Sequence, residues 1–217
     1  MRTPKLQRSA LAALSLLVGA CASTPEHLYT LDAAARPSTA SRSDLPIVLV
    51  GPVTIPEMVD RPELVVREGK YGVVVNEQER WATPLKDSLP LVVAMQLSEK
   101  CPGATFRLLS STAVEEPHGR LAIEFTNIEI NRTTGVSVVA AWRYRDGSKH
   151  GIEGVGEGHA DIASTTFSSY VDAMQRALVA WANYVATQLP LCQLVSTPFD
   201  LRKSSSRAIR ANSQRDH

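Results

Sequence analysis

Hydrophobic and polar residues follow the two-residue period of β-strands in several parts of the chain. An apolar run covers residues 47–53, and residues 64–67 and 71–75 flank Glu68-Gly69-Lys70, which predicts a β-hairpin. Four strand-like segments follow later: residues 105–109, 121–130, 136–144 and 151–162. The second of these changes the parity of its apolar positions, which predicts a β-bulge near Thr126-Asn127. Together the segments predict a mostly antiparallel or mixed sheet.

The last two strand-like segments predict a specific hairpin register. If a five-residue loop joins them, Trp142 lies opposite Gly154 and Arg143 lies opposite Glu153. The indole of Trp142 then covers a residue that has no side chain, and the other face of the hairpin gains an ion pair. This register explains the Gly-x-Gly-x-Gly run of residues 154–158 without a ligand.

A first helix is predicted over residues 84–100, where apolar residues recur at helical spacing. Thr83 is the expected N-cap and Pro84 the expected first helical residue, a position that proline favours. Pro90 falls inside this segment, so we expect it to kink the helix or to delay its start.

A second helix is predicted over residues 169–189, with an apolar stripe at spacings of three and four. Ser169 and Asp172 fit a capping box at its start. The strands and helices together predict an α+β fold, a single domain in which a sheet is flanked by two main helices.

The first twenty residues resemble an export signal, with three positive residues, an apolar stretch at 9–18 and two small residues before Cys21. The stretch is too short to cross a bilayer core, which needs about 20 apolar residues. Residues 17–21 resemble the lipobox of bacterial lipoproteins, which implies lipidation of Cys21 and cleavage before it. The alternative is an ordinary secretory signal with a chance cysteine at the cleavage point. Ala22, where an Asp would favour inner-membrane retention, indicates by resemblance the periplasmic face of the outer membrane.

We therefore expect four consecutive segments along the chain. These are a signal peptide at 1–20, a lipidated N-terminus and flexible tether at 21–45, a folded domain at 46–200 and a basic disordered tail at 201–217. Within the tether, only residues 28–31 are expected to be ordered.

The charge distribution argues against a nucleic-acid-binding protein. The whole chain has a formal net charge of +1, but the signal peptide and the tail hold eight of its basic residues. Between Cys21 and Leu201 the net charge is −6, from 15 basic and 21 acidic residues. Nucleic-acid-binding domains usually present a basic face, so we expect no nucleic-acid partner.

Cys101 and Cys192 remain as a pair in the expected folded domain. In an oxidising periplasm such a pair is expected to form a disulfide, here between the ends of the two predicted helices. The alternative is two buried free thiols.

The sequence contains no convincing catalytic site, and we expect neither enzyme activity, cofactor nor bound metal. His159 with Glu157 or Asp161 could hold a metal ion, but alternate residues of a strand equally form a solvated charged face. Residues 154–158 lack the Lys-Ser/Thr ending of a phosphate-binding loop, and no Gly-x-Ser-x-Gly elbow is present.

Charged and aromatic residues stand beside prolines at the edges of the predicted elements between positions 60 and 85. Arg and Trp are typical of protein interfaces, so this region predicts a partner surface. Its candidate residues are Asp60, Arg61, Pro62, Arg80 and Trp81. In the alternative, an arginine pairs internally with an acid such as Asp60, and Trp81 lies in the core.

The same region carries a family resemblance. The motifs are Tyr29-x-Leu31, Val53-x-Ile55-Pro56, the block Asp60 to Arg67, and Arg80-Trp81-Ala82-Thr83-Pro84-Leu85. They resemble the ABC-type transport auxiliary lipoproteins, the PqiC/YmbA-like family, from about Leu28 to Leu194. Thr83 stands where the family usually has an acidic residue.

The resemblance implies a sheet flanked by two helices and a non-enzymatic lipoprotein. By resemblance its partners are an MCE-domain protein and inner-membrane transporter components that move lipids or other hydrophobic compounds between membranes. Homo-oligomerisation is a further expectation. A second hypothesis is a lipoprotein that carries a lipid in its own cavity.

Overall fold

The computed structural model describes residues 25–32, 45–111, 116–147 and 151–193. The predicted signal peptide, Cys21 and the basic tail lie outside these residues. The strands are β1 (His27–Tyr29), β2 (Ile47–Thr54), β3 (Glu63–Glu68), β4 (Gly72–Trp81), β5 (Thr105–Leu108), β6 (Gly119–Asn131), β7 (Gly135–Asp146) and β8 (Gly151–Ala160). The helices are the 3₁₀-helix η1 (Glu57–Val59) and the α-helices α2 (Leu85–Lys100), α3 (Phe167–Gln188) and α4 (Pro190–Gln193).

Strand β6 lies at the centre of one eight-stranded mixed sheet. Along one edge it pairs with antiparallel β7, and β8 pairs with β7 in turn. Along its other edge, parallel β2 pairs with the first half of β6, and β3 pairs with its end at Asn131. Strand β5 extends the β2 branch, whereas β4 and β1 extend the β3 branch, so the sheet divides into two branches on this side.

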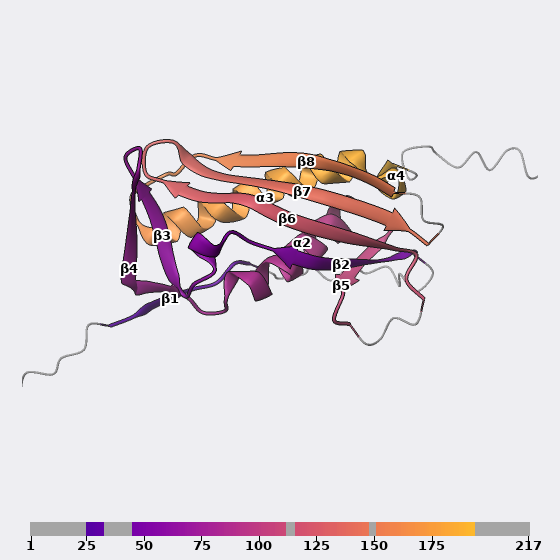
Figure 1. The fold of residues 1–217 in the computed structure, drawn as a ribbon, viewed down its shortest axis with the longest axis horizontal. Coiled ribbons are helices and arrows are strands. Elements are labelled where there is room, and N and C mark those ends of the chain that lie inside the picture. Colours follow the sequence, from indigo (N-terminus) through magenta and orange to yellow (C-terminus); the bar gives the residue numbers. More distant parts are fainter. Residues whose placement is uncertain (1–24, 33–44, 112–115, 148–150, 194–217) are drawn as a thin grey trace, which may run out of the picture.

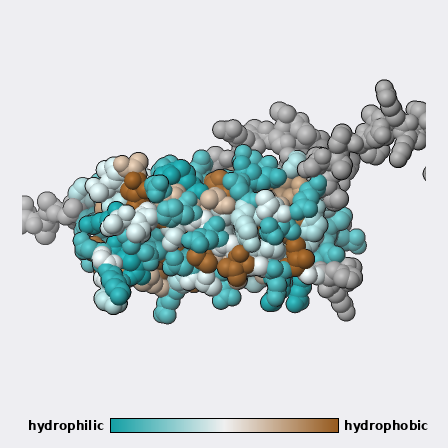
Figure 2. Space-filling view, turned by 90° about the horizontal axis from the view of Figure 1, so that it is seen from above, coloured by the Kyte–Doolittle hydropathy of each residue, from teal (hydrophilic) through white to brown (hydrophobic). Residues whose placement is uncertain are grey.

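Helices α2 and α3 lie on the same face of the sheet (Figure 1). This arrangement confirms the predicted α+β fold with one mixed sheet and two main helices. We call the sheet face that is turned away from α2 and α3 the open face. Seen from above, on the side of β8 in Figure 1, the surface is mostly hydrophilic with small separate hydrophobic patches (Figure 2).

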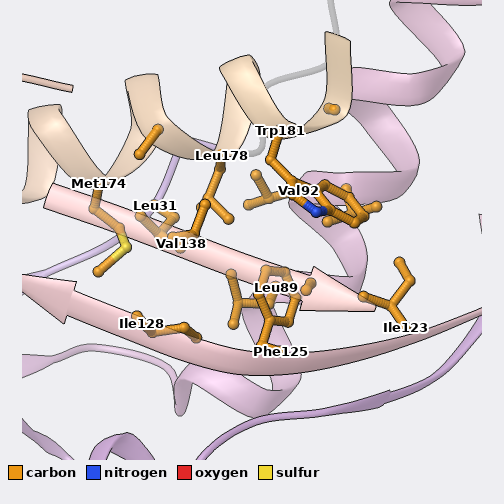
Figure 3. Packing of buried hydrophobic residues seen from close by; sticks show 14 of the residues in the cluster. Leu31, Leu89, Val92, Ile123, Phe125, Ile128, Val138, Met174, Leu178 and Trp181 are labelled. Atoms are coloured by element: carbon orange, nitrogen blue, oxygen red, sulfur yellow. The ribbon is translucent and has the colours of Figure 1, made fainter. Parts of the chain in front are cut away.

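The hydrophobic core fills the space between the sheet and the two helices. Figure 3 shows Met174, Leu178 and Trp181 pointing from α3 toward the strands. The rings of Trp181 and Phe125 lie 5.6 Å apart, centroid to centroid. Since all four side chains are buried, the apolar stripe predicted for the second helix is the face that closes the core.

Both details predicted for the strand pairing are confirmed. The register of β6 with β7 shifts between Phe125 and Asn127, at the predicted bulge. In the β7–β8 hairpin, Trp142 pairs with Gly154 and Arg143 with Glu153. The guanidinium Nε of Arg143 donates to a carboxylate oxygen of Glu153 at 2.7 Å, and the indole of Trp142 covers Gly154.

The N-cap residue and the first residue predicted for the first helix are wrong. Pro84 is the N-cap residue of α2, without a side-chain hydrogen bond, so neither Thr83 as cap nor Pro84 as first helical residue is correct. Pro90 lies inside α2, which continues through it. Because Pro90 lies in the second turn, it removes only one of the amide donors that close the helix.

The predicted capping box of the second helix is also wrong. Helix α3 begins two residues earlier, with Thr166 as N-cap, and the hydroxyl of Thr166 accepts from the amide of Ser169 at 3.4 Å. Asp172 instead forms an ion pair with Arg176 at 3.0 Å, one turn further along. Thr166 supplies the cap because Ser169 is already within the helix, where its amide needs an acceptor.

The predicted disulfide between Cys101 and Cys192 is present, with the two Cα atoms 4.4 Å apart. Cys101 is the C-cap residue of α2, and Cys192 lies in α4, which follows α3. The bond therefore joins the ends of the two long helices, as the sequence predicts.

Candidate functional site

The two sequence segments predicted to form a partner surface meet at one end of the sheet. Glu63, at the start of β3, pairs with Arg80, near the end of β4. The amide of Trp81 donates to the carbonyl of Pro62 at 2.7 Å. Residues about twenty positions apart in the sequence thus form one edge of the domain. The register between β3 and β4 shifts just after Glu63, which lets this edge turn away from the rest of the hairpin.

Two ion pairs organise the charged side chains of this edge. Arg61 donates from Nε to Glu63 at 3.0 Å, and Arg80 pairs with Glu26 at 2.9 Å. The hydrogen bond from Arg61 holds the pKa of Glu63 below its ordinary value. Both arginines are therefore paired within the protein, as the alternative interpretation of the sequence predicts, although their partners are acids other than Asp60. A polar groove of ≈ 510 Å³ lies among these four side chains and their neighbours.

The other candidates divide between the surface and the core. Asp60 and Pro62 are exposed, and Asp60 forms an ion pair with Lys86 at 3.4 Å. Trp81 is only 6% exposed and belongs to the core, so it is not available for direct contact with a partner. Trp81 supports this edge from beneath, because β4 ends between Pro62 and strand β1.

Strand β1 attaches to this edge through a polar cluster that the sequence did not reveal. Tyr29 pairs with Trp81 across parallel strands, and Nδ1 of His27 lies 2.9 Å from Oε1 of Glu79. Burial, together with the nearby carboxylate of Glu79, raises the pKa of Tyr29 to about 12. Burial alone would raise the pKa of Glu79, but Tyr29 and His27 outweigh it and hold that pKa below its ordinary value.

Glu79→Gln is expected to loosen β1 and to lower the melting temperature at pH 7 by roughly 2 to 4 °C. The folded protein holds Glu79 ionised below the ordinary pKa of 4.5, whereas the unfolded chain does not. The stabilisation by this carboxylate is therefore complete above pH 4.5 and is lost as the pH falls through the lower folded pKa. Urea unfolding between pH 7 and pH 3 measures the difference between wild type and variant, which should shrink with acid.

The control for this experiment is Glu77→Gln, since Glu77 is an exposed carboxylate on the same strand. Its unfolding free energy should follow that of wild type at every pH. A difference between wild type and Glu79→Gln that stays constant down to pH 3 would contradict a role for the ionised carboxylate.

The predicted alternative of a metal site finds little geometric support. His159 pairs with Asp161 at 3.4 Å across the surface of β8. In the part of the chain that the structure describes, no group of three or more His, Cys, Asp or Glu side chains could hold a metal ion. The charged edge around Arg61 and Arg80 is suited to binding by hydrogen bonds and ion pairs, since its charged side chains are exposed or partly exposed.

Two solved structures are similar in fold to this chain. A solved structure of an uncharacterised protein is 15% identical and matches 76% of this chain and 99% of its own, with a TM-score of 0.64. A Xanthomonas campestris protein of the family DUF330 is 16% identical and matches 73% of this chain and 92% of its own, with a TM-score of 0.56. At these identities the two structures show a shared fold. No curated protein sequence matches the chain.

No helix among the described residues has the length and apolar character needed to cross a membrane. The profile of the ABC-type transport auxiliary lipoprotein component matches residues 29–186, from β1 to near the end of α3. It therefore includes the sheet, both long helices and the charged edge around Arg61 and Arg80. The chain belongs to the family of ABC-type transport auxiliary lipoprotein components.

Proposed function

We propose that the protein is a non-enzymatic lipoprotein of the outer membrane that docks an MCE-type partner of an ABC-type intermembrane lipid transport system. The family match over residues 29–186 carries this proposal. The lipobox before Cys21 supports a lipid anchor, and the charged edge around Arg61 and Arg80 supports contact with a protein. Inner-membrane transporter components complete the system. Self-association of the chain is compatible with this role and is tested by its mass in solution.

Strand β1 supports a close connection between the anchor and the domain. His27 is already paired with Glu79 in the sheet, and only six positions separate His27 from Cys21. Such a link spans at most about 20 Å when extended. A lipid on Cys21 therefore keeps the charged edge near the membrane surface.

The packing of the described core does not support the second hypothesis, a lipid carried in an internal cavity. Beside Trp81 and Met174, the packing between sheet and helices leaves a void of only ≈ 10 Å³. That volume is about the space of one water molecule, far below an acyl chain. A carrier would therefore have to hold its lipid on the surface. Lipid that co-purifies with the protein in a fixed molar ratio would support this second hypothesis.

The test is binding of the purified, lipid-anchored chain to a purified MCE protein of the same organism. We expect a stable complex, and we expect Arg61→Ala and Arg80→Ala each to weaken it by about tenfold. Both arginines are exposed or partly exposed, so the variants should remain folded. Affinity is measured by biolayer interferometry with the lipidated chain in nanodiscs.

Arg176→Ala is the matched control, because Arg176 is an ion-paired arginine on α3 whose side chain contacts Asp172 and Asp161 and no residue of the charged edge. It should bind as wild type does. Absence of any complex with the wild-type chain would contradict the proposed function, and equal binding by all three variants would remove the charged edge from the interface.

A further inference from the structure

Three arginines form one row across the open face. Leu49 of β2 pairs with Arg107 of β5 on one side and with Arg120 of β6 on the other. Arg120 pairs in turn with Arg145 of β7. On each strand one neighbour of the arginine packs in or against the core, namely Phe106, Leu121 and Tyr144, so the guanidinium groups project on the opposite side. We call Arg107, Arg120 and Arg145 the arginine row.

The arginine row differs from all other described arginines in its lack of partners. Arg61, Arg67, Arg80, Arg132, Arg143 and Arg176 each form an ion pair with a carboxylate. No described acid lies within ion-pair distance of the arginine row, and all three of its side chains are exposed. In a domain that is acidic overall, the described arginines that lack an ion pair are thus concentrated in one line.

The pairing of Arg120 with Arg145 is also unfavourable in itself. Like charges directly opposite each other on neighbouring strands destabilise a sheet. Arg143 lies two positions before Arg145 in β7. It faces Glu153 and forms an ion pair with it at 2.7 Å, which is the arrangement that a sheet favours. A local arrangement that weakens the fold without an internal benefit is typical of a binding site.

We propose that the arginine row binds a carboxylate-rich surface of a protein partner. This inference rests on the proposed function only in requiring a transport partner, and it is independent of the edge around Arg61. Neighbouring strands lie about 4.8 Å apart, so the Cα atoms of the row span about 14 Å. Guanidinium groups pair with carboxylates in a bidentate geometry, and arginine is enriched at protein interfaces for that reason.

The place of the arginine row in the fold favours a protein over the anchoring membrane. Arg120 is the second residue of β6, and Asn131, where β3 pairs, is the last, about 36 Å away along the strand. The row thus lies at the opposite end of the sheet from β1, the strand that a lipid on Cys21 would hold near the membrane (Figure 1). It is placed to meet a component that approaches from the periplasm.

The rest of the open face adds no attraction for an anionic membrane. Glu63, Glu129 and Glu153 are each paired with an arginine, so their charges are balanced. Glu124 and Glu157 form no ion pair with a described residue, and such carboxylates are repelled by an anionic lipid surface. A protein surface can present its carboxylates to the arginine row alone, whereas a membrane surface is anionic throughout.

The test compares the lipid-anchored wild type with the triple variant Arg107→Gln, Arg120→Gln, Arg145→Gln for binding to the purified MCE partner. We expect the triple variant to bind about tenfold more weakly than wild type. It should also lose most of the salt dependence that wild-type binding shows between about 50 and 300 mM NaCl, a range over which the Debye length changes roughly twofold. The melting temperature of the triple variant should be equal to or above that of wild type, because repulsion between Arg120 and Arg145 is removed.

The control is the triple variant Arg67→Gln, Arg132→Gln, Arg176→Gln, which removes the same charge from ion-paired arginines that belong neither to the arginine row nor to the charged edge around Arg61 and Arg80. Two further probes are a hexaglutamate peptide and vesicles of phosphatidylglycerol, each offered to wild type and to the arginine-row variant. Binding of the peptide through the row supports the proposal, and binding of vesicles through the row without any effect on the partner overturns it in favour of lipid. If wild type binds the partner and the arginine-row variant binds equally well, the inference fails while the proposed function stands. If wild type binds no partner and no hexaglutamate, both fail.

Discussion

Replacing Cys101 and Cys192 together by alanine is expected to lower the free energy of unfolding by about 4 kcal/mol. The disulfide closes a loop of 91 residues, which includes β5 to β8 and α3. In the chain-entropy model, closing a loop of that length lowers the conformational entropy of the unfolded chain by an amount equivalent to this free energy. Cys101 is also completely buried, so the alanine variant loses packing as well as the bond.

Urea unfolding of wild type and the double alanine variant, each with and without a thiol reductant, measures this effect. Reductant should destabilise wild type by nearly the same amount as the double substitution and should leave the variant unchanged. Wild-type protein that unfolds at the same urea concentration with and without reductant would contradict the prediction. The comparison separates the covalent bond from the packing of Cys101, because reduction removes only the bond.

The elements that local sequence predicts well are those whose partners are close in the chain. The β7–β8 hairpin is joined by a short loop, so its length fixes which residues face each other. Trp142 opposite Gly154 and Arg143 opposite Glu153 follow from that constraint, and both are present. The parity of the apolar positions likewise locates the bulge near Asn127, since only one face of the strand can meet the core.

The helix starts show the limit of local signals. Thr83 and Ser169 have side chains suited to capping, but Thr166 and Pro84 occupy the caps. Several hydroxyl residues precede the second helix, and each could accept from an amide two or three positions ahead. The choice among them depends on packing of the first turn, where the ring of Phe167 meets Tyr170 at 5.4 Å.

The arginine row could not be predicted from the sequence, for a physical reason. Leu49 and Arg120 are 71 positions apart and meet only because β2 and β6 are parallel neighbours. Parallel pairing is not set by a turn, so no spacing rule connects those residues. The same reason explains why Glu79 and His27 escaped notice, since β1 and β4 are also parallel. Candidate sites that depend on nonlocal register emerge only with the fold.

Gly158→Ala is expected to destabilise the protein by about 3 kcal/mol, at the upper end of the usual effect of overpacking. A Cβ atom on Gly158 would lie 2.0 Å from the backbone oxygen of Ala177 and 2.8 Å from the amide nitrogen of Trp181. Both atoms belong to the backbone of α3, so the whole helix would have to move away from β8. The side chains of Trp181 and its neighbours would then lose contact with the core.

Two other glycines provide a graded comparison for Gly158→Ala. A Cβ on Gly156 would approach side-chain atoms, the closest being Cδ1 of Tyr184 at 2.7 Å, and Tyr184 is 40% exposed and can rotate away. A Cβ on Gly147 would meet nothing within 4 Å. Thermal unfolding of the three alanine variants should therefore show the largest loss at Gly158, a smaller loss at Gly156 and less than about 0.5 kcal/mol at Gly147. Equal losses at Gly158 and Gly156 would mean that strand flexibility, rather than the helix backbone, limits these positions. Because backbone atoms of α3 cannot rotate out of the way as a tyrosine ring can, the close approach of α3 to β8 requires glycine at position 158 in particular.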